Sequence, residues 1–498
     1  MPLTQSPFTA KFNDRVQGLL DRWHVPGLAI AVIDGPSTFS KGYGFSVLPD
    51  TPVTPETVFF TASTTKSFTA ASVSLLIDEN PGLDWTSTLS SVIKDEFVLS
   101  DSSITSQVTF EDALSNRAGL SDHKLSFGPK TNSVKDAVRS LRHLPLAADF
   151  RARYLYSSYM FSAVSHAVET MTGSGLGDLM KERLWGPLGM RHTYWTPQQA
   201  AADPGTILAQ GYAWDASTKT FIEQPVPDFP AVSGAGAMIS NVVDYAKWLR
   251  GMMNMSSPLS QAAHQTLTEP RIHFTESGNN PFAPPHAYAL GWTIDTYHGQ
   301  RVIWHGGSWT GFGSVMMYLP DLQWGLVMMG NTTGTSNCVQ ISLFMDMLDE
   351  LLGTPSPERV DWSSELELRI ANRRRDNLRV RERLYPSLPS QPSRPSVSLD
   401  AHAGRYSHPA YGNLDLELRG VSLFADRLLQ EIPMVIWMLH VTGDSWLARL
   451  EVLRQDPRDC DFVKATFEFT VDRVAKRVGL DLEPALGGEM IWFNRLIL

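Results

Sequence analysis

Two groups of compact apolar segments, separated by a long stretch with a helical pattern, constrain the fold of this chain most strongly. The first apolar segment, residues 27–33, ends in Asp34-Gly35, a dipeptide that favours a tight β-hairpin with a return strand after it. The later group lacks clean alternation of apolar and polar residues, so we expect antiparallel strands in a sheet covered on both faces. The expected strands are 27–33, 39–43, 301–304, 314–319 and 325–329.

Between the two groups, apolar residues recur three and four positions apart, which indicates helices. Strands at both ends of a helical middle predict an α/β (α+β) domain. In it, an antiparallel sheet is flanked by helices and carries an inserted helical lobe. The clearest helical segments are 108–114, 159–170 and 242–252.

A proline-rich segment marks the expected boundary between this domain and the C-terminal part. It follows a charged helix expected over residues 363–384. Four closely spaced prolines predict a stiff, extended linker. They are Pro386, Pro389, Pro392 and Pro395.

The C-terminal hundred residues show a strand pattern. The segments 414–418 and 467–471 alternate with period two, which predicts a small antiparallel barrel or sandwich. We therefore expect a catalytic domain over residues 1–355, a helical and proline-rich linker over 356–396 and a β-barrel domain over 397–498.

The overall composition excludes several classes of function. The net charge of −10 over 498 residues argues against a nucleic-acid partner, because phosphate contacts need a clustered positive surface. No stretch approaches a membrane span, and residues 1–12 lack the apolar core of a secretory signal. Cys338 and Cys460 alone make no disulfide framework. We expect reduced thiols and a cytoplasmic location.

A candidate nucleophile is Ser63, which stands with Lys66 in the pattern S-x-x-K. On a helix this spacing places hydroxyl and amine on one face, where a buried amine of lowered pKa can take the hydroxyl proton. The pattern also begins at Ser91 and Ser121, so by itself it identifies no site. Only the Ser63 copy follows an apolar run and opens a helix, whose N-terminus favours an oxyanion. A helix-start serine with a surface lysine is the alternative interpretation.

Two further elements can complete such a site. Tyr156 stands just before a helical segment, where a phenol near a lysine could relay a proton, although tyrosines commonly serve as core residues. His305 follows an expected strand, and Gly306 and Gly307 would let a substrate lie close to the backbone. A simple turn would also explain these glycines.

The order and spacing of the three elements resemble the serine β-lactamase and penicillin-binding-protein family, especially its branch of class C β-lactamases, D,D-peptidases and esterases. The likeness covers roughly residues 12–350. Residues 399–406 and 411–412 are similar to a lipocalin-like barrel appended to some members. The matching landmarks in the first part are 26–32, 41–44, 60–66, 113–120, 185–190, 288–292 and 319–321.

The resemblance implies roles for individual residues. Ser63 would be the acylated nucleophile, with Lys66 and Tyr156 as the proton-handling pair. His305 would belong to a substrate-facing strand, together with the glycines that follow it. The backbone N–H groups of Ser63 and Ser308 would form the oxyanion hole.

Two residues depart from the family's pattern. Ser158 stands where the family has asparagine, and it cannot supply the amide donor and acceptor of that side chain. His305 stands where the family has lysine, as it does in peptidase and esterase branches. Acylation chemistry tolerates both changes, whereas recognition of a β-lactam should suffer.

We therefore expect a serine hydrolase or acyltransferase that forms an acyl-enzyme on Ser63 with an ester, thioester or amide, and that is esterase-like rather than an efficient β-lactamase. The alternatives are a biosynthetic acyltransferase, a D-amino-acid peptidase and an inactive binding protein on the same scaffold. No metal or cofactor is expected, since no H-E-x-x-H or clustered histidine spacing occurs. The expected partners are a small-molecule acyl substrate and an acyl-carrier or acceptor molecule, with no nucleic acid or membrane. The oligomeric state stays open.

Overall fold

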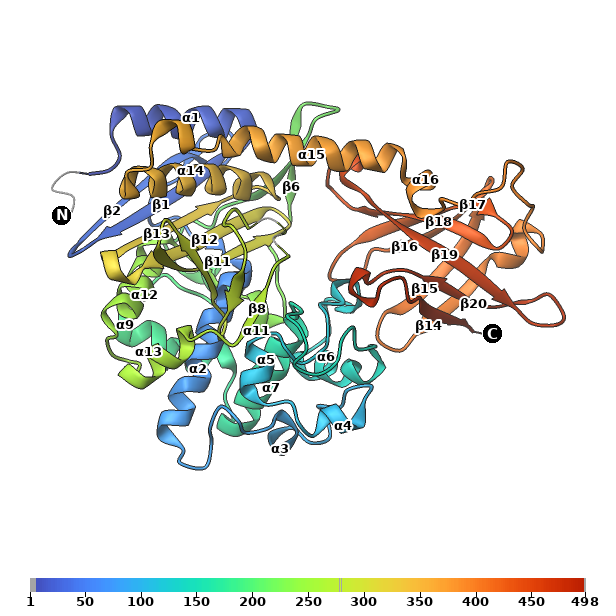
Figure 1. Cartoon of the computed structure of the whole chain (residues 1–498), viewed down its shortest axis with the longest axis horizontal. Helices are drawn as coiled ribbons and strands as arrows, with labels where there is room; N and C mark the ends of the chain where they lie inside the picture. Colours follow the sequence, from blue (N-terminus) through green and yellow to red (C-terminus); the bar gives the residue numbers. More distant parts are fainter. Residues whose placement is uncertain (1–5, 277, 279, 497–498) are drawn as a thin grey trace.

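The computed structural model describes residues 6–276, 278 and 280–496, so the first five residues of the predicted non-signal segment lie outside it. Figure 1 shows two parts, a large sheet with helices on both faces and a closed barrel beside it. The long helix α15 (Trp362–Leu378) runs from one part to the other. The predicted fold class, a mixed α/β domain with a C-terminal antiparallel barrel, is confirmed.

The central sheet joins strands from both ends of the first part of the chain. β1 (Gly27–Asp34) pairs with β2 (Ser37–Val47) on one side and with β13 (Trp324–Gly330) on the other, both antiparallel. The two predicted groups of strands thus form one sheet. The strands, in order across the described sheet, are β3 (Thr51–Pro52), β2, β1, β13, β12 (Phe312–Leu319), β11 (Gln300–Trp309), β10 (Thr293–Tyr297), β9 (His286–Tyr288) and β8 (Ile272–Phe274).

Successive residues of β1 point into two different hydrophobic cores. Leu28 and Ile30 pack beneath a layer of helices on one face, whereas Ala29 and Ala31 face the helical lobe on the other. Because both faces are covered, residues 28–33 of the strand are all apolar and show no alternation. The covering layer consists of α1 (Ala10–Trp23), α14 (Thr335–Leu352) and α15.

The helical lobe contains the three predicted helices, observed as α5 (Phe110–Leu114), α7 (Ser158–Thr172) and α12 (Val242–Asn254). Local capping sets where α12 begins, since the Asn241 side chain accepts a hydrogen bond from the Asp244 N–H. The other described helices of the first part are α2 (Thr65–Glu79), α3 (Leu89–Val92), α4 (Ser102–Thr105), α6 (Val134–Ser140), α8 (Leu176–Met180), α9 (Gly186–Leu188), α10 (Pro197–Ala202), α11 (Ser233–Gly236) and α13 (Gln261–Thr268).

Four short strands lie outside the central sheet and form two antiparallel pairs. They are β4 (Phe59–Phe60) with β7 (Ile239–Ser240), and β5 (Gly211–Asp215) with β6 (Thr220–Gln224). The first pair lies immediately before the candidate nucleophile Ser63, so it anchors the chain there.

The C-terminal part is a closed antiparallel barrel in which each strand pairs with its neighbours in sequence and the last pairs with the first. Its interior is filled by apolar side chains, among which Phe467 contacts the rings of Tyr406 and Trp446. The strands are β14 (Gly404–His408), β15 (Gly412–Arg419), β16 (Ser422–Arg427), β17 (Met434–Thr442), β18 (Ser445–Val452), β19 (Asp461–Phe469), β20 (Ala475–Leu480) and β21 (Ile491–Arg495).

Part of the predicted linker packs on the barrel. Val380, in α16 (Val380–Leu384), forms a small apolar cluster with Val441 and Leu447 on two barrel strands. Hydrophobic contact therefore fixes the start of the proline-rich segment against the barrel wall. The boundaries of the three expected domains stay a prediction.

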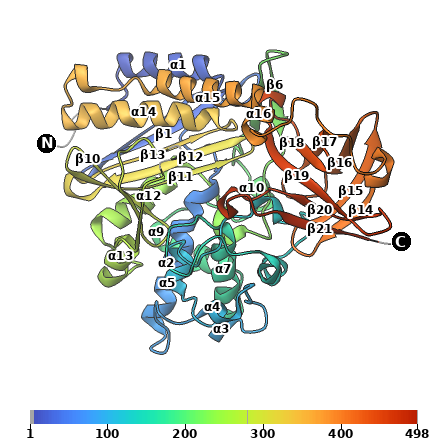
Figure 2. The same cartoon turned by 45° about the vertical axis from the view of Figure 1, so that its right-hand side comes forward.

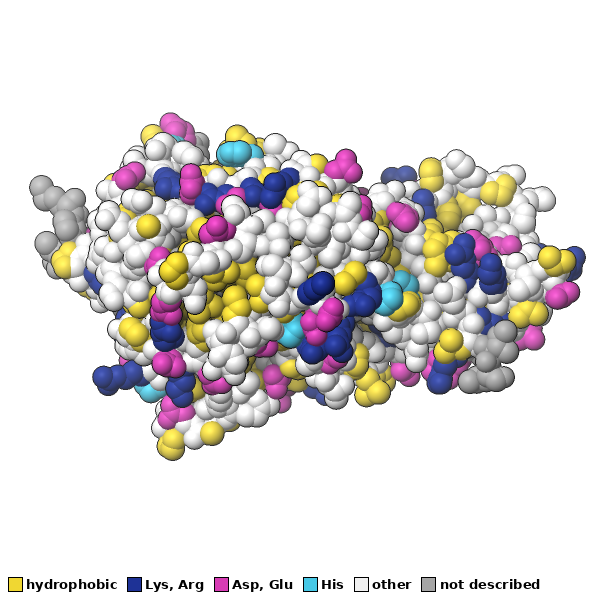
Figure 3. Space-filling view, turned by 90° about the horizontal axis from the view of Figure 1, so that it is seen from below, with side chains coloured by type: hydrophobic (Ala, Val, Ile, Leu, Met, Phe, Trp, Pro, Cys, Tyr) yellow, Lys and Arg dark blue, Asp and Glu magenta, His cyan; other side chains and the backbone are white. Residues whose placement is uncertain are grey.

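The barrel also contacts the helical lobe directly, as Figure 2 shows from a second direction. Pro129 and Gln430 form an isolated antiparallel bridge, and the Glu431 N–H donates to the Gly128 carbonyl at 2.8 Å. On the face seen in Figure 3, the two parts join in a continuous surface on which acidic and basic side chains intermingle.

Cys338 and Cys460 are free thiols. In the described ranges, no helix is long and apolar enough to cross a membrane.

Candidate active site

Ser63 lies in a single turn of 3₁₀ helix that leads directly into α2, as the sequence predicts for a helix start. The preceding Ala62 has a φ of 49°, a left-handed conformation that costs an alanine about 1–2 kcal/mol. Neighbouring Thr61 is held on both sides: its hydroxyl donates to the Met238 carbonyl at 2.9 Å, and its own carbonyl accepts from the Ser314 hydroxyl at 2.6 Å. These bonds can hold the strained turn that presents Ser63.

The structure brings Ser63, Lys66 and Tyr156 together. The Tyr156 hydroxyl donates to Ser63 Oγ at 2.7 Å, and Lys66 Nζ lies 3.3 Å from the same oxygen. Lys66 Nζ also donates to the Ala235 carbonyl at 3.0 Å and lies 4.6 Å from the centre of the Tyr156 ring. The serine oxygen therefore has an amine and a phenol within hydrogen-bond distance.

The two groups that flank Ser63 differ in their readiness to accept a proton. Lys66 is fully buried, and burial lowers its pKa to about 7, against the opposing charge of Asp122. Burial raises the pKa of Tyr156, so its phenol keeps its proton at neutral pH. Near pH 7 a large share of Lys66 is neutral amine, which makes it the better proton acceptor of the pair.

His305 lies on β11, with its ring centre 6.5 Å from that of Tyr156. Its Nε2 lies 3.1 Å from the Tyr288 hydroxyl, and its Nδ1 lies 2.7 Å from the Gly306 carbonyl. Since a carbonyl only accepts, Nδ1 carries the proton. Burial, assisted by the positive charge of Lys66, lowers the pKa of His305 to about 3. His305 is therefore neutral and supplies no positive charge to a substrate.

Gly307 lets β11 approach the nucleophile. A Cβ at this position would lie 2.3 Å from the Thr61 carbonyl oxygen and 3.2 Å from the Ser63 nitrogen, so only glycine fits without displacement. Residues 305–308 lie within β11, so the turn interpretation of these glycines is wrong. Ser308 is exposed on the same strand. The oxyanion hole formed by the N–H groups of Ser63 and Ser308 stays a prediction.

Ser158, the other departure from the family's pattern, is the first residue of α7. Its backbone N–H donates to Asp122 Oδ1 at 2.8 Å. The Asp122 charge raises the pKa of both Lys66 and Tyr156, so this carboxylate belongs to the electrostatic surroundings of the site. Sequence reasoning missed Asp122 as a site residue and noted it only inside a competing S-x-x-K pattern. Its position two residues after the landmark 113–120 was the available signal.

An aromatic wall beside His305 was also missed. Tyr288 was noted only as a landmark, and Tyr154 had no signal in the sequence. The Tyr154 ring stacks on Phe274 with 4.3 Å between ring centres and lies 5.2 Å from the Tyr288 ring. Three aromatic side chains from separate segments therefore line up along this side of the site.

The competing S-x-x-K copies do not resemble the Ser63 site. Ser91 and Lys94 are both exposed, and the Ser91 hydroxyl donates to a backbone carbonyl within its own turn. Ser121 is buried, whereas Lys124 is exposed. Both lysines are exposed, so neither serine has a buried base beside it.

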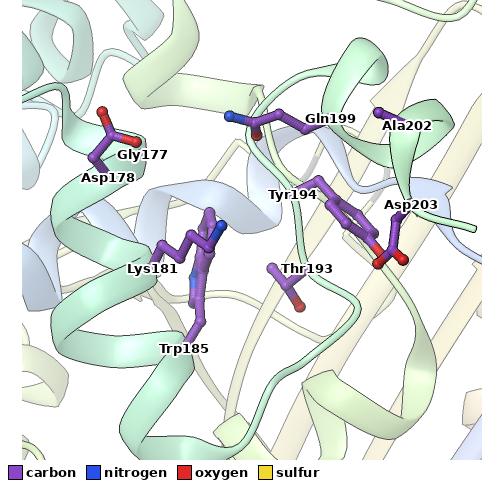
Figure 4. Close-up of a pocket in the computed structure, with 9 residues that line it drawn as sticks. All are labelled: Gly177, Asp178, Lys181, Trp185, Thr193, Tyr194, Gln199, Ala202 and Asp203. Carbon is purple, nitrogen blue, oxygen red and sulfur yellow. The ribbon is translucent and has the colours of Figure 1, made fainter.

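The hollow in Figure 4 lies away from this group. It is lined by α8, by the following π-helical turn Lys181–Trp185 and by the segment 193–203. Among the described residues that line it, none belongs to the predicted catalytic or substrate-binding set. The site around Ser63 is thus defined by its side chains, not by this hollow.

The fold and this site define an enzyme of the serine β-lactamase class. The family model described as "Beta-lactamase" matches residues 12–341, so the chain belongs to the β-lactamase family. A second model, described as a domain of unknown function (DUF3471), matches residues 388–495, which include the barrel.

Within the family, this chain is similar to two curated fungal proteins over nearly its whole length. It is 37% identical to the unguisins hydrolase ungD' of Aspergillus campestris, covering 98% of this chain and 92% of the relative. It is 36% identical to the unguisins hydrolase ungD of Aspergillus violaceofuscus, covering 99% and 91%. In fold it resembles the octameric penicillin-binding protein homologue from Pyrococcus abyssi, with a TM-score of 0.62, 18% identity and coverage of 97% and 99% of the two chains.

Proposed function

We propose that the protein is a serine hydrolase that cleaves an amide, ester or thioester through a covalent acyl-enzyme on Ser63. The observation that carries the proposal is the hydrogen-bonded group in which Ser63 Oγ lies between the Tyr156 phenol and the buried Lys66 amine. A serine hydroxyl needs a neighbouring base, and the Lys66 pKa of about 7 supports that role near neutral pH.

In the acylation step, neutral Lys66 takes the Ser63 proton as Oγ bonds to the substrate carbonyl carbon. The carbonyl electron pair moves to oxygen, and the N–H groups of Ser63 and Ser308 are the proposed donors to this oxyanion. As the adduct collapses, the bond to the leaving group breaks. The leaving group takes a proton from Tyr156, which regains one from the Lys66 ammonium.

In the deacylation step, a water gives a proton to Lys66 and its oxygen bonds to the acyl carbon. The acyl bond to Ser63 then breaks, and Oγ recovers a proton from the ammonium. The net reaction consumes one water, cleaves one acyl bond and returns the enzyme unchanged.

The charges around Ser63 support a substrate without a free carboxylate next to the scissile bond. Neutral His305 offers no cation for a carboxylate, and Asp122 adds a negative charge on the other side. Ser158 cannot replace the hydrogen bonds of an asparagine amide. These features favour esters and internal amides over penicillins and cephalosporins.

The test uses the substrates named for the two fungal relatives. We expect purified protein incubated with unguisins to give products whose combined mass exceeds that of the substrate by one water, as measured by mass spectrometry. A Ser63→Ala variant should leave the unguisins intact. Cleavage of the unguisins by this variant would contradict the proposal.

A further inference from the structure

One loop connects the catalytic group to the barrel. On its inner side, Asp122 accepts a hydrogen bond from the first N–H of α7, two residues after Tyr156. On its outer side, His123 contacts two barrel residues, Tyr411 and Glu483. Adjacent residues of the loop therefore face the active site and the barrel.

His123 has a backbone conformation that needs support. Its φ is 42°, in the left-handed region that residues other than glycine adopt uncommonly. Its N–H donates to Glu483 Oε2 at 2.9 Å, and its ring is buried. Strain of this kind persists only where the surroundings hold it in place, and here a barrel carboxylate accepts the backbone N–H.

The ring of His123 is fixed at both nitrogens. Nε2 lies 3.0 Å from the Pro145 carbonyl, which only accepts, so Nε2 carries the proton. Nδ1 then accepts from the Tyr411 hydroxyl at 2.8 Å. Burial lowers the pKa of His123 to about 4, which is consistent with this neutral form.

The rest of the loop is tied to the barrel as well. Arg427 donates to the Leu125 carbonyl at 3.3 Å, and the Lys130 N–H donates to the Leu429 carbonyl at 3.4 Å. These two contacts are long, so the firm part of the connection consists of the bonds at His123 and the 2.8 Å bond from the Glu431 N–H to the Gly128 carbonyl.

We propose that the barrel residues Tyr411 and Glu483 are positioning residues for the active site. By holding His123, they keep the Asp122 carboxylate beside the catalytic group. The inference rests on the proposed function, in which Lys66 is the proton acceptor.

The expected effect follows from the groups that face Lys66. These are Ser63, Tyr156, neutral His305 and the Asp122 carboxylate. Asp122 is the member whose charge raises the pKa of Lys66. Moving this charge away lowers the pKa of Lys66, so the acid limb of kcat/KM shifts to lower pH. A loss of barrel stability alone would not move this limb.

The experiment measures kcat/KM against pH with p-nitrophenyl acetate, at the isosbestic wavelength of p-nitrophenol, using the full chain. Asp122→Asn should shift the acid limb to lower pH by about half a unit or more. Tyr411→Phe should shift it in the same direction, and the double variant should shift no further than Asp122→Asn alone. Tyr406→Phe is the matched control, because Tyr406 is an equally buried barrel tyrosine whose hydroxyl donates to the His402 carbonyl.

A second pair of variants tests Glu483. Glu483→Gln keeps an oxygen that can accept from His123 and should leave the limb unchanged, whereas Glu483→Ala should shift it. An unmoved limb in Tyr411→Phe, an equal shift in Tyr406→Phe, or additive shifts in the double variant would overturn the inference. Lys66→Ala keeps the two proposals apart. Undiminished activity in that variant refutes the proposed function, whereas a large loss of activity in it together with an unmoved limb in Tyr411→Phe refutes only the positioning role of the barrel residues.

Discussion

The catalytic part and the barrel are both built on antiparallel strands, but they differ in which strand positions are buried. Every residue of β12 and β13 is buried, because helices cover both faces of the sheet, whereas β15 alternates between buried and solvent-facing positions. Lys66, on α2, is fully buried, and its Nζ donates to the Ala235 carbonyl on α11. The barrel interior is occupied by its own apolar side chains, which leaves its ends and outer wall for contacts. The candidate catalytic residues thus lie in the first part, whereas the barrel offers surfaces for contact.

The largest effect should come from the catalytic part. Ser63→Ala should lower esterase kcat/KM by a factor on the order of 10⁴ or more, because it removes the nucleophile. It should also abolish labelling by a fluorophosphonate, read by intact mass and peptide mapping. Ser91→Ala is the matched control in the same sequence pattern and should leave both unchanged. Persistent labelling of Ser63→Ala would refute the assignment of Ser63 as the nucleophile.

A core substitution in the barrel should instead act on stability. Phe467→Ala should lower the free energy of unfolding of the barrel by about 3–5 kcal/mol, because it opens a cavity among the rings of Tyr406 and Trp446. Denaturant titration followed by tryptophan fluorescence measures this. Val421→Ala, at a position 76% exposed, should change it by less than about 0.5 kcal/mol. Equal losses in both variants would contradict a packed interior.

Removing the base should have a smaller effect than removing the nucleophile. Lys66→Ala should lower the acylation rate by a factor on the order of a hundred or more, because a positioned general base contributes about 10²–10⁴. Single-turnover kinetics with p-nitrophenyl acetate isolates this step. Lys124→Ala, the lysine of a competing pattern, should behave like the wild type. A loss in Lys124→Ala as large as that in Lys66→Ala would contradict the assignment.

The preference among substrates should reflect the neutral His305 side chain on β11. We expect kcat/KM for p-nitrophenyl esters and an acyl thioester to exceed that for nitrocefin by about tenfold or more, since neutral His305 offers no positive charge to a β-lactam carboxylate. Nitrocefin turnover as fast as that of the esters would refute this expectation. His305→Lys, which introduces a cation at this position, should narrow the difference.

The pH dependence should report the buried lysine. Because Lys66 has a pKa of about 7 and must be neutral to accept a proton, kcat/KM should fall below pH 7, by about tenfold for each unit well below it. His305, with a pKa lowered to about 3, should contribute no limb between pH 5 and 8. A profile that is flat down to pH 5 would show that Lys66 is not the titrating base.

Much of the fold followed from local patterns. The run 27–33 appears as β1, and the helix expected at 242–252 appears as α12, because hydrophobic periodicity is a local property. The strand expected at 301–304 continues through Trp309, since glycines that look like a turn in sequence allow close approach of β11 to Ser63 in the fold. The packing of Val380 on the barrel had no local signal, because it depends on residues more than fifty positions away.

The sequence by itself determined the pairing of Ser63 with Lys66, since a spacing of three brings two side chains together on any helix. The approach of Tyr156 and His305 was accessible only through resemblance to a family. Tertiary structure alone decided which lysine is buried enough for its pKa to fall to about 7, and it alone placed Asp122 beside that lysine. Burial and the positions of distant charges are properties of the whole packed chain, and no local pattern encodes them.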